Sequence, residues 1–273
     1  MMHRLNYVFA TIIACFLAIS CCPEKPPTIV PCQTDRVVLV EEFTGMKCVN
    51  CPSGHRKIKE LQQTYPNKIV PVAIHSHWPV YSAPQNGYDF RTADGEIIEK
   101  DMKASNLPSA MVNRKYFEES GVYALEGFTN WAGSIAAELC LPPDATIQLN
   151  PTYDDNNRKV TVTVDVAPTN AVRMKERVGL TVLITESHII APQEGLSGWD
   201  YNYEHNHVLR DVITDTWGTK IQEKGETLTP HQEVLTYTLP TDWNPDNCHL
   251  VAFVHYQGDE RYVLQAAEAD LVP

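Results

Sequence analysis

The sequence has no run of 18 or more apolar residues, so no helix that crosses a bilayer is expected in the mature protein. Basic residues are scarce, 22 against 34 acidic, and they form no cluster, which argues against nucleic acid or anionic membranes as partners. The Gly-x-Ser-x-Gly and His-Glu-x-x-His motifs, a phosphate-binding loop and a dinucleotide fingerprint are also missing. An acidic globular chain of 273 residues with eight cysteines remains to be interpreted.

The N-terminal segment has the pattern of an export signal. A basic start precedes an apolar stretch over residues 7–19, which ends at Ser20 and Cys21. This pattern is typical of a secretory signal peptide over residues 1–20. The small residue before Cys21 is similar to a bacterial lipobox, which implies lipidation of Cys21. Cys22 is the alternative lipid site, and a plain cleaved signal is the alternative interpretation.

Residues 21–35 are rich in proline, with four prolines between Pro23 and Pro31. Such a segment favours extended chain and cannot pack a core, so we expect a tether between the membrane and the folded part. Export also places the cysteines in an oxidising compartment, where disulfides can persist.

Residues 36–141 alternate between strand and helix patterns. A short apolar run over residues 37–43 is followed by apolar residues at helical spacing, Ile58, Leu61 and Tyr65, and by a second apolar run over residues 69–75. A strand, a helix and a strand of these lengths predict a parallel pair. Further along we expect a weak helix at 96–102, a strand at 110–112 and a helix at 128–139.

Residues 142–273 have a different, all-β pattern. Every second residue between Lys159 and Val166 is a valine, which predicts a strand with one buried and one wet face. About seven strands are expected, the number typical of an immunoglobulin-like antiparallel β-sandwich. The strand candidates are residues 146–149, 159–166, 179–185, 208–213, 234–239, 250–256 and 262–267. The predicted fold class is therefore an α/β domain followed by an all-β sandwich.

The clearest chemical motif is Cys48-Val49-Asn50-Cys51, between a predicted strand and a predicted helix. Two residues between the thiols allow a disulfide across one helical turn. The unpaired N–H groups at a helix N-terminus stabilise the thiolate of the first cysteine, and Lys47 adds a positive charge. Pro52 suits the first helical turn, where its missing N–H costs nothing. These features predict thiol-disulfide exchange, with Cys48 as nucleophile and Cys51 as resolving cysteine.

A second feature is Pro108, directly before the predicted strand that includes Met111 and Val112. A Cys-x-x-Cys motif after a strand together with such a proline resembles the thioredoxin superfamily. The resemblance implies a thioredoxin-like fold for residues 36–141 and a cis peptide bond before Pro108, which would shape the substrate groove. The sequence departs from the thioredoxin pattern in its Val-Asn dipeptide and in lacking a tryptophan before the first cysteine.

The thioredoxin resemblance also implies a partly buried acid before the motif. Glu42 lies six residues before Cys48 and is a candidate base for Cys51. The alternative is that Glu42 lies on the wet face of the strand, since we expect only one of Glu41 and Glu42 to point inward.

A narrower resemblance is to the twenty-eight-kilodalton outer-membrane lipoprotein family of Gram-negative anaerobes, over most of residues 36–273. It implies a lipid-anchored protein of the outer membrane, on its cell-surface or periplasmic face. Members are described as surface adhesins or receptors. The matching strings are Val40-Glu41-Glu42-Phe43-Thr44-Gly45, Cys48-Val49-Asn50-Cys51-Pro52, Ala73-Ile74-His75, Pro108-Ser109, Val112-Asn113-Arg114 and Glu204-His205-Asn206-His207-Val208-Leu209-Arg210.

Metal binding is the rival interpretation of the same cysteines. Cys48, Cys51 and His55 have ligand spacing, and His75-x-His77 ends a neighbouring strand. The motif has no Cys-x-x-Cys partner, and Pro52 after Cys51 excludes a haem attachment site. We therefore expect no metal and no cofactor. His205 and His207, two residues apart at the start of a predicted strand, could likewise bind an ion, but we interpret them as solvated or hydrogen-bonded surface histidines.

Three cysteines outside the motif, Cys32, Cys140 and Cys248, allow three pairings, between which the sequence does not choose. A Cys140 to Cys248 bridge would join the two domains. The aromatic segment 197–203 is expected to be a loop, which either contacts a protein or glycan or packs on its own domain.

The sequence thus supports two hypotheses. The first is thiol-disulfide exchange on exported proteins, with their thiols and disulfides as partners. The second is a non-enzymatic surface adhesin or receptor, in which the cysteine pair is structural and the sandwich binds a surface ligand.

Overall fold

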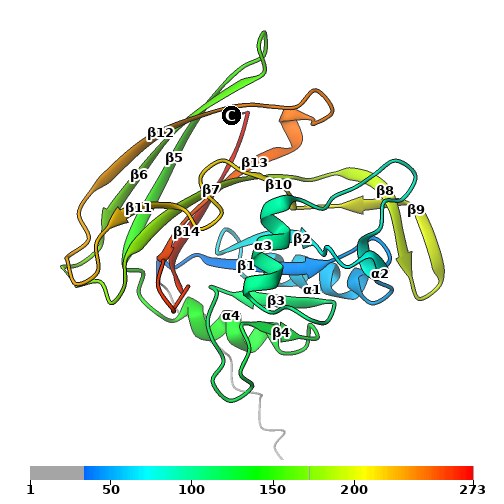
Figure 1. The fold of residues 1–273 in the computed structure, drawn as a ribbon, viewed down its shortest axis with the longest axis horizontal. Helices are drawn as coiled ribbons and strands as arrows, with labels where there is room; N and C mark the ends of the chain where they lie inside the picture. Colours follow the sequence, from blue (N-terminus) through cyan, green and yellow to red (C-terminus); the bar gives the residue numbers. More distant parts are fainter. Residues whose placement is uncertain (1–33, 172, 273) are drawn as a thin grey trace, which may run out of the picture. The chain divides into compact units, whose positions relative to one another are not determined.

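The computed structural model describes residues 34–171 and 173–272, drawn as a ribbon in Figure 1. The signal peptide, most of the tether and the predicted lipid site Cys21 lie outside these residues, as do Cys22 and Cys32. No helix among the described residues is both long and apolar enough to cross a membrane.

The largest sheet joins strands from both ends of the described chain (Figure 1). Its order is β14-β13-β7-β10-β2-β1-β3-β4, and β11 pairs with β7. The strands are β1 (Val38–Thr44), β2 (Ile69–His75), β3 (Ser109–Val112), β4 (Ala124–Glu126), β7 (Val178–Glu186), β10 (Val208–Val212), β11 (Thr219–Gln222), β13 (Cys248–Tyr256) and β14 (Val263–Asp270).

The N-terminal part confirms the predicted strand, helix and strand. β1 and β2 pair in parallel, and helix α1 connects them. β3 lies antiparallel on the other side of β1, and β4 pairs antiparallel with β3. Every residue of β1 and β2 is buried, which explains why both read as continuous apolar runs. The helices are α1 (Cys51–Thr64), α2 (Pro79–Ser82), α3 (Ala93–Asp101) and α4 (Trp131–Leu139).

Helices cover both faces of this part of the sheet. On one face Ile58 and Leu61 of α1 share a buried cluster with Val40 of β1 and Trp131 of α4. On the other face Ile98 of α3 belongs to a separate cluster with residues of β1 and β13. The β1 and β2 strands are therefore the centre of a layered α/β structure.

Strand β10 joins the C-terminal half to this sheet. Val208 of β10 lies opposite Ala73 of β2 in a parallel pair, and the Ala73 N–H donates to the His207 carbonyl at 2.7 Å. On its other edge β10 pairs antiparallel with β7. The sheet thus crosses the division predicted at residue 142, and that division stays a prediction.

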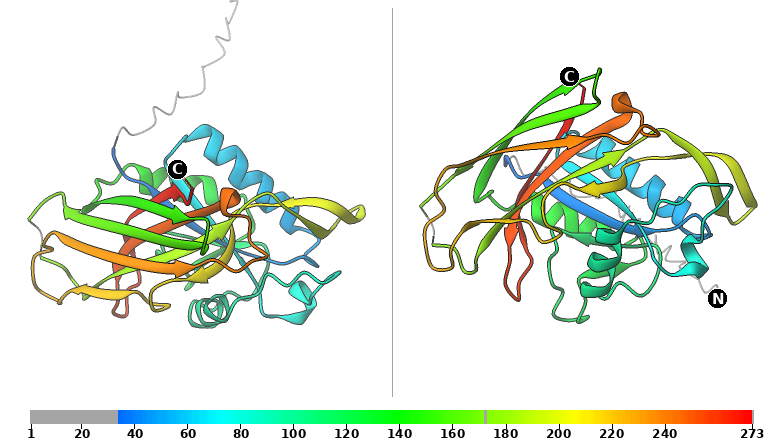
Figure 2. Two further views of the ribbon diagram at one scale, coloured as in Figure 1. Left: turned by 90° about the horizontal axis from the view of Figure 1, so that it is seen from above. Right: turned by 45° about the horizontal axis from the view of Figure 1, so that its top comes forward.

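A second sheet packs on those strands of the first sheet that come from the C-terminal half of the chain, among them β7 and β13 (Figure 2). Val160, Val162, Val164 and Val166 of β6 are buried in one cluster with residues of β7 and β13, which confirms the alternation read from the sequence. The fold is mixed α/β, with most elements being strands in several sheets. The three-stranded sheet has the order β12-β6-β5, with β5 (Ala145–Asp154), β6 (Lys159–Pro168) and β12 (His231–Thr238), and the short helix η1 (Pro245–Asn247) precedes β13.

The segment predicted as a loop at 197–203 is instead part of a hairpin. β8 (Ile189–Gly195) and β9 (Gly198–His205) form a two-stranded sheet that extends beyond β10 (Figure 1). The loop prediction was wrong because aromatic residues at positions 199, 201 and 203 repeat with the period of a strand, while the residues between them are polar.

A buried ion pair of the N-terminal half packs against aromatic rings of the C-terminal half. Arg114 donates to both carboxylate oxygens of Glu41 at 2.6 and 2.7 Å, and both side chains are inaccessible to solvent. The Arg114 guanidinium also lies over the rings of Phe253 and Trp217, at 4.7 and 5.2 Å from their centroids. Because a bidentate pair in a dry environment satisfies both charges, neither partner can be lost alone without leaving a buried charge.

We therefore expect Glu41→Ala to lower the free energy of unfolding by about 3–5 kcal/mol, because it leaves Arg114 buried without its counter-charge. Urea unfolding followed by far-UV circular dichroism would measure the change. The control is Glu60→Ala, which removes an exposed partner of Lys57 at 3.4 Å and is expected to cost at most about 1 kcal/mol. Equal effects of the two substitutions would contradict this account of the buried pair.

Candidate functional site

The cysteine pair lies where the parallel strands β1 and β2 end. Cys48 is in the loop after β1, and Cys51 is the first residue of α1, with Pro52 behind it. The two cysteines form a disulfide with their Cα atoms 5.4 Å apart. Both are buried, Cys48 with 3% and Cys51 with 0% of its surface exposed. The predicted arrangement of strand, loop, disulfide and helix start is present.

Pro108 precedes β3 and follows a cis peptide bond from Leu107, as the thioredoxin resemblance implied. It lies on the same side of the sheet as α1, since a Cβ atom built on Gly54 would be 3.2 Å from Pro108 Cβ. The helix that carries Cys51 and the segment that carries Pro108 are therefore close neighbours.

Glu42 is buried beneath α1 and has only 2% of its surface exposed. Its Oε1 atom accepts no hydrogen bond, and a Cβ atom on Gly54 would be 2.4 Å from it. Burial raises the pKa of Glu42 well above the ordinary value for a carboxyl group. The carboxyl group thus lies one helical turn beyond Cys51 along α1.

The expectation that only one of Glu41 and Glu42 points inward was wrong. Both are buried, on opposite faces of β1, because packed elements cover the sheet on both sides. Glu41 is neutralised by Arg114, whereas no cation pairs with Glu42. The two acids therefore differ in chemistry: one is a structural anion, and the other is a carboxyl group with a raised pKa.

His55, on the same helix, connects Glu42 to the hairpin. Its Nε2 atom lies 2.8 Å from Thr44 Oγ1 and 3.9 Å from Glu42 Oε2, and its Nδ1 atom lies 2.6 Å from Tyr203 Oη. Burial, with a smaller effect of His205, lowers the pKa of His55 to about 3. The imidazole is therefore neutral at physiological pH and makes no ion pair with Glu42.

The β8–β9 hairpin and helix α2 cover the disulfide loop. The Gln193 side-chain amide donates to the carbonyls of Gly45 and Cys48, each at 3.2 Å, and the Glu194 N–H donates to the Met46 carbonyl at 2.7 Å. From the other side, the Lys47 N–H donates to the carbonyl of Tyr81 in α2 at 2.7 Å. These contacts hold the hairpin and α2 against the loop that contains the buried Cys48, and no local sequence pattern indicated them.

The histidines predicted as alternative ligands are distributed among other contacts. His75 and His205 pack against Phe90, with ring centroids 5.0 and 5.1 Å away. His77 pairs with Glu96 instead of facing the cysteines. Within residues 34–171 and 173–272 no group of three or more histidine, cysteine or acidic side chains could hold a metal ion. His205 is buried, not the surface residue that the sequence indicated.

The structure gives the bonding state of two of the three cysteines outside the motif, Cys140 and Cys248. Cys140 is disulfide-bonded, whereas Cys248 is free and buried, so no Cys140 to Cys248 bridge forms. Burial raises the pKa of the Cys248 thiol to about 12, which makes it unreactive at neutral pH. Cys248 thus behaves as a small core residue.

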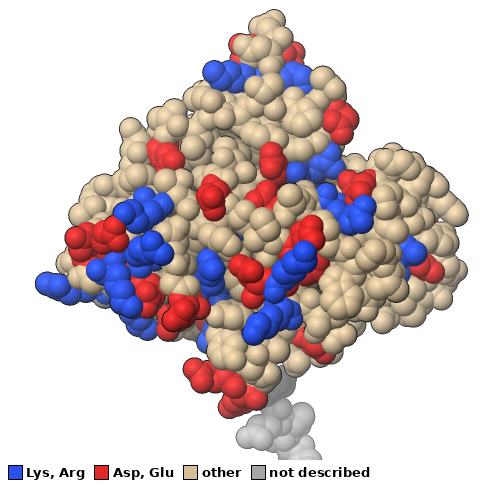
Figure 3. All heavy atoms as spheres, in the orientation of Figure 1, with Lys and Arg blue, Asp and Glu red and all other residues tan. Residues whose placement is uncertain are grey.

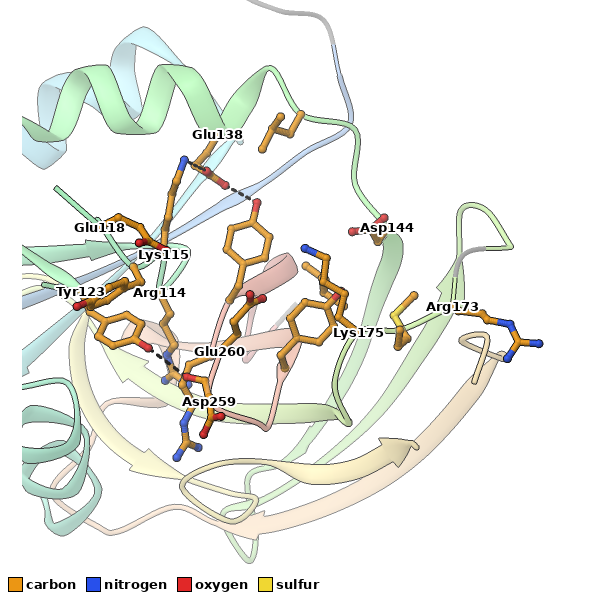
Figure 4. A pocket seen from close by; sticks show the side chains of 17 residues that line it. Arg114, Lys115, Glu118, Tyr123, Glu138, Asp144, Arg173, Lys175, Asp259 and Glu260 are labelled. Carbon is orange, nitrogen blue, oxygen red and sulfur yellow. Dashed lines mark hydrogen bonds and ion pairs between the residues drawn. The ribbon is translucent and has the colours of Figure 1, made fainter. Parts of the chain in front are cut away.

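Two of the cavities among the described residues differ in where they lie relative to the cysteine pair. A cleft of about 620 Å³ lies beside α1, and Glu42, His55 and Tyr203 are among its lining residues. A second cavity, of about 710 Å³, lies near α4 and the loop between β13 and β14 (Figure 4). Acidic and basic side chains are mixed around that second cavity, and its acid Glu138 already accepts from Tyr262 at 2.6 Å. Only the first cleft reaches the residues next to the cysteine pair.

The face of the molecule drawn in Figure 3 carries few charges over the hairpin that covers the disulfide loop. Figure 3 shows acidic and basic side chains mixed over the face that it draws, with few over β8 and β9. Large apolar side chains are exposed on the covering elements, among them Leu196, Tyr201, Trp78 and Val80. Such a surface favours contact with a protein over contact with a nucleic acid.

Comparison with known proteins gives a family match and a fold match. Residues 96–271 match the family described as outer membrane protein Omp28. HBP35 of Porphyromonas gingivalis superposes with a TM-score of 0.67 at 16% identity, covering 88% of this chain and 76% of the other. A protein from Agrobacterium tumefaciens superposes with a TM-score of 0.51 at 12% identity, covering 87% and 96%.

A domain of the outer membrane lipoprotein Omp28 from Porphyromonas gingivalis is 21% identical over 48% of this chain and 90% of that domain, with a TM-score of 0.34. A search of curated protein sequences gave no match. At these identities the solved structures establish the fold alone.

The close approach of Glu42 to α1 predicts the effect of a methyl group on Gly54. The new Cβ atom would also lie 3.1 Å from Trp131, so we expect Gly54→Ala to lower the free energy of unfolding by about 1–3 kcal/mol. Gly133→Ala in α4 is the matched control: it has open space around it and should stabilise the protein by about 0.5–1 kcal/mol. Denaturant unfolding measures both, and stabilisation by Gly54→Ala as well would mean that Glu42 does not lie against this helix.

The raised pKa of Glu42 predicts a pH-dependent stability. The folded protein retains the proton at pH values where the unfolded chain has lost it, so this group destabilises the fold increasingly as the pH rises above the unfolded pKa, about 4.3. Glu42→Gln stays neutral, and its unfolding free energy relative to the wild type should rise between about pH 4 and pH 8. Urea titrations at both pH values test this, with the exposed Glu60→Gln as control; a pH-independent difference would contradict the burial of an unpaired carboxyl group.

Proposed function

The chain belongs to the Omp28 outer membrane protein family, and on that basis we propose that it is a membrane-anchored exported protein that exchanges thiols and disulfides with other exported proteins. The observation that carries the proposal is the Cys48–Cys51 disulfide at the start of α1, above the unpaired carboxyl group of Glu42. The helix N-terminus favours the thiolate form of Cys48, which is the reactive form of a cysteine.

In the reducing direction the Cys48 thiolate attacks one sulfur of a substrate disulfide. A bond forms between Cys48 and that sulfur, and the second substrate sulfur leaves as a thiolate and takes a proton from water. Glu42 as carboxylate then takes the proton of the Cys51 thiol, and the Cys51 thiolate attacks Cys48. The Cys48–Cys51 disulfide forms, and the first substrate sulfur leaves. Two electrons have passed from the protein dithiol to the substrate disulfide, and the oxidising direction reverses these steps.

Access to Cys48 requires movement of its cover. Because the residue is 3% exposed, a substrate sulfur can approach it only when the contacts of Gln193 and Glu194 with the disulfide loop are broken. Pro108 would then border the groove that receives the substrate chain, the role that the thioredoxin resemblance implies.

The anchoring of the protein follows the family and the N-terminal sequence. The family is named for the outer membrane, and the segment Ser20-Cys21 supplies a lipid attachment site. We place the lipid on Cys21 and leave the membrane face to experiment. For residues 142–273 we propose an immunoglobulin-like β-sandwich, supported by the valine face of β6 that packs on β7 and β13.

A second candidate function is a surface adhesin or receptor with a structural cysteine pair. The burial of both cysteines favours it, because a disulfide that substrates cannot reach acts only as a covalent link. The exposed apolar side chains of the hairpin, Leu196 at 81% and Tyr201 at 60% exposure, would then contribute to a binding surface.

Trapping and redox titration distinguish the two candidates. Cys51→Ser should accumulate reducible covalent complexes with exported proteins, whereas Cys48→Ser should not, because only Cys48 makes the mixed disulfide. In the wild type we expect a potential between about −120 and −270 mV and faster alkylation of Cys48 than of Cys51.

The control is Cys248→Ser, which removes a buried thiol outside the motif and should leave trapping and potential unchanged. A potential below about −300 mV, with both cysteines inert after reduction, would reject the exchange function and favour the structural pair of an adhesin. Equal trapping by Cys48→Ser and Cys51→Ser would reject the assigned roles.

A further inference from the structure

The aromatic segment of the hairpin and the histidine of α1 meet at the buried acid. Tyr203 of β9, His55 of α1 and Glu42 of β1 come from three separate parts of the chain and line one cleft. From the geometry we propose that His55 and Tyr203 are positioning residues that form a proton path between the Glu42 carboxyl group and the water of this cleft. The proposal rests on the exchange function proposed above, because it assigns the route by which Glu42 exchanges the proton of Cys51 with solvent.

The three side chains form a series from the core to the surface. The Glu42 side chain is 3% exposed and the His55 side chain 20% exposed, and Tyr203 lies at the wall of the cleft. His55 Nδ1 and Tyr203 Oη are 2.6 Å apart, a short hydrogen bond. On the inner side His55 Nε2 is 2.8 Å from Thr44 Oγ1 and 3.9 Å from Glu42 Oε2, so a shift of about 1 Å that exchanges Thr44 for Glu42 brings the histidine and the acid to hydrogen-bond distance.

The number of protons is conserved whether the proton moves from Glu42 to the water of the cleft or in the reverse direction. Outward, the carboxylic acid of Glu42 gives its proton to His55 Nε2, His55 Nδ1–H gives its proton to Tyr203 Oη, and the hydroxyl hydrogen of Tyr203 passes to water in the cleft. Glu42 becomes a carboxylate, and His55 and Tyr203 remain neutral, with the ring hydrogen of His55 now on Nε2. No electron moves in these steps, and no bond between heavy atoms changes.

No described residue is hydrogen-bonded to the carboxyl group of Glu42, whose side chain is 3% exposed where it lines the cleft. Its Oε1 atom is buried without a partner, and Gly54 leaves room for the carboxyl group against α1. A buried base that must take and release a proton in each cycle needs a group within hydrogen-bond reach, directly or through one water. His55 is the ring that approaches it, and Tyr203 holds that ring from the side of the cleft.

The surroundings of the path favour the uncharged forms of His55 and Tyr203, the two residues that would carry the proton. Burial keeps His55 neutral at physiological pH, and it raises the pKa of Tyr203 to about 12, so that its hydroxyl group keeps its hydrogen. The titratable and charged groups around the path are His205 and Asp200 of β9, His207 after it, Arg56 of α1, Glu42 of β1 and His75 of β2, and the cleft is also lined by Lys59, His188, Glu204 and His249.

The test separates the two chemical steps of exchange. Reduced protein is mixed with hydroxyethyl disulfide, quenched with acid, and analysed by mass spectrometry for the mixed disulfide on Cys48 and for its resolution by Cys51, across a range of pH. His55→Ala and Tyr203→Phe should form the mixed disulfide at the wild-type rate and resolve it about tenfold more slowly, less than the 10²–10⁴ typical of direct proton transfer. Added imidazole should restore the resolution rate of His55→Ala, because it can enter the cleft and carry the proton.

Tyr201→Phe is the matched control, because Tyr201 is exposed on the same strand and touches none of the three groups through a described contact. It should resolve the mixed disulfide at the wild-type rate. Unchanged resolution in both Tyr203→Phe and His55→Ala would overturn the proton path and leave the exchange function intact. Equal slowing of both steps without rescue by imidazole would also overturn it, because that is the result of a structural defect. A wild-type protein that forms no mixed disulfide would instead reject the exchange function and the path with it.

Discussion

The parallel pairing of β10 with β2 is the constraint on which the rest of the structure depends. Without it, β2 would be the edge of the N-terminal sheet, with unpaired N–H and carbonyl groups. With it, the bond from the Ala73 N–H to the His207 carbonyl fixes where the chain before β10 must lie. Because β8 and β9 directly precede β10, this pairing holds the hairpin over the disulfide loop, and it brings Tyr203 to His55.

The burial of both faces of the sheet gives two neighbouring acids opposite properties. Glu41 points to the face shared with the C-terminal half, where Arg114 neutralises it and Phe253 and Trp217 surround the guanidinium. Glu42 points to α1, where no cation compensates the loss of hydration. A carboxyl group that reduces stability at neutral pH thus lies close to a disulfide, which is the arrangement that the proposed proton transfer requires.

The candidate site is therefore built by both halves of the chain. The N-terminal part supplies the cysteine pair, the buried acid and Pro108, and the hairpin of the C-terminal half supplies the cover and the tyrosine. Family membership places this arrangement in an outer membrane protein family. Cys48 is 3% exposed beneath this cover, so the proposed exchange depends on access to Cys48 as well as on the chemistry of its thiol.

The sequence by itself determined the features that depend on local order. The apolar runs of β1 and β2, the helical spacing of α1, the disulfide spacing of Cys48 and Cys51 and the alternation in β6 each follow from a few adjacent residues. The tertiary structure decided what depends on pairing between distant segments: the strand β10 beside β2, the hairpin over the disulfide, the burial of both Glu41 and Glu42, and the contact of His55 with Tyr203. These could not be read from the sequence because strand register and the covering of a sheet face are set by residues that are distant in the sequence, and no local pattern of charge or hydropathy encodes them.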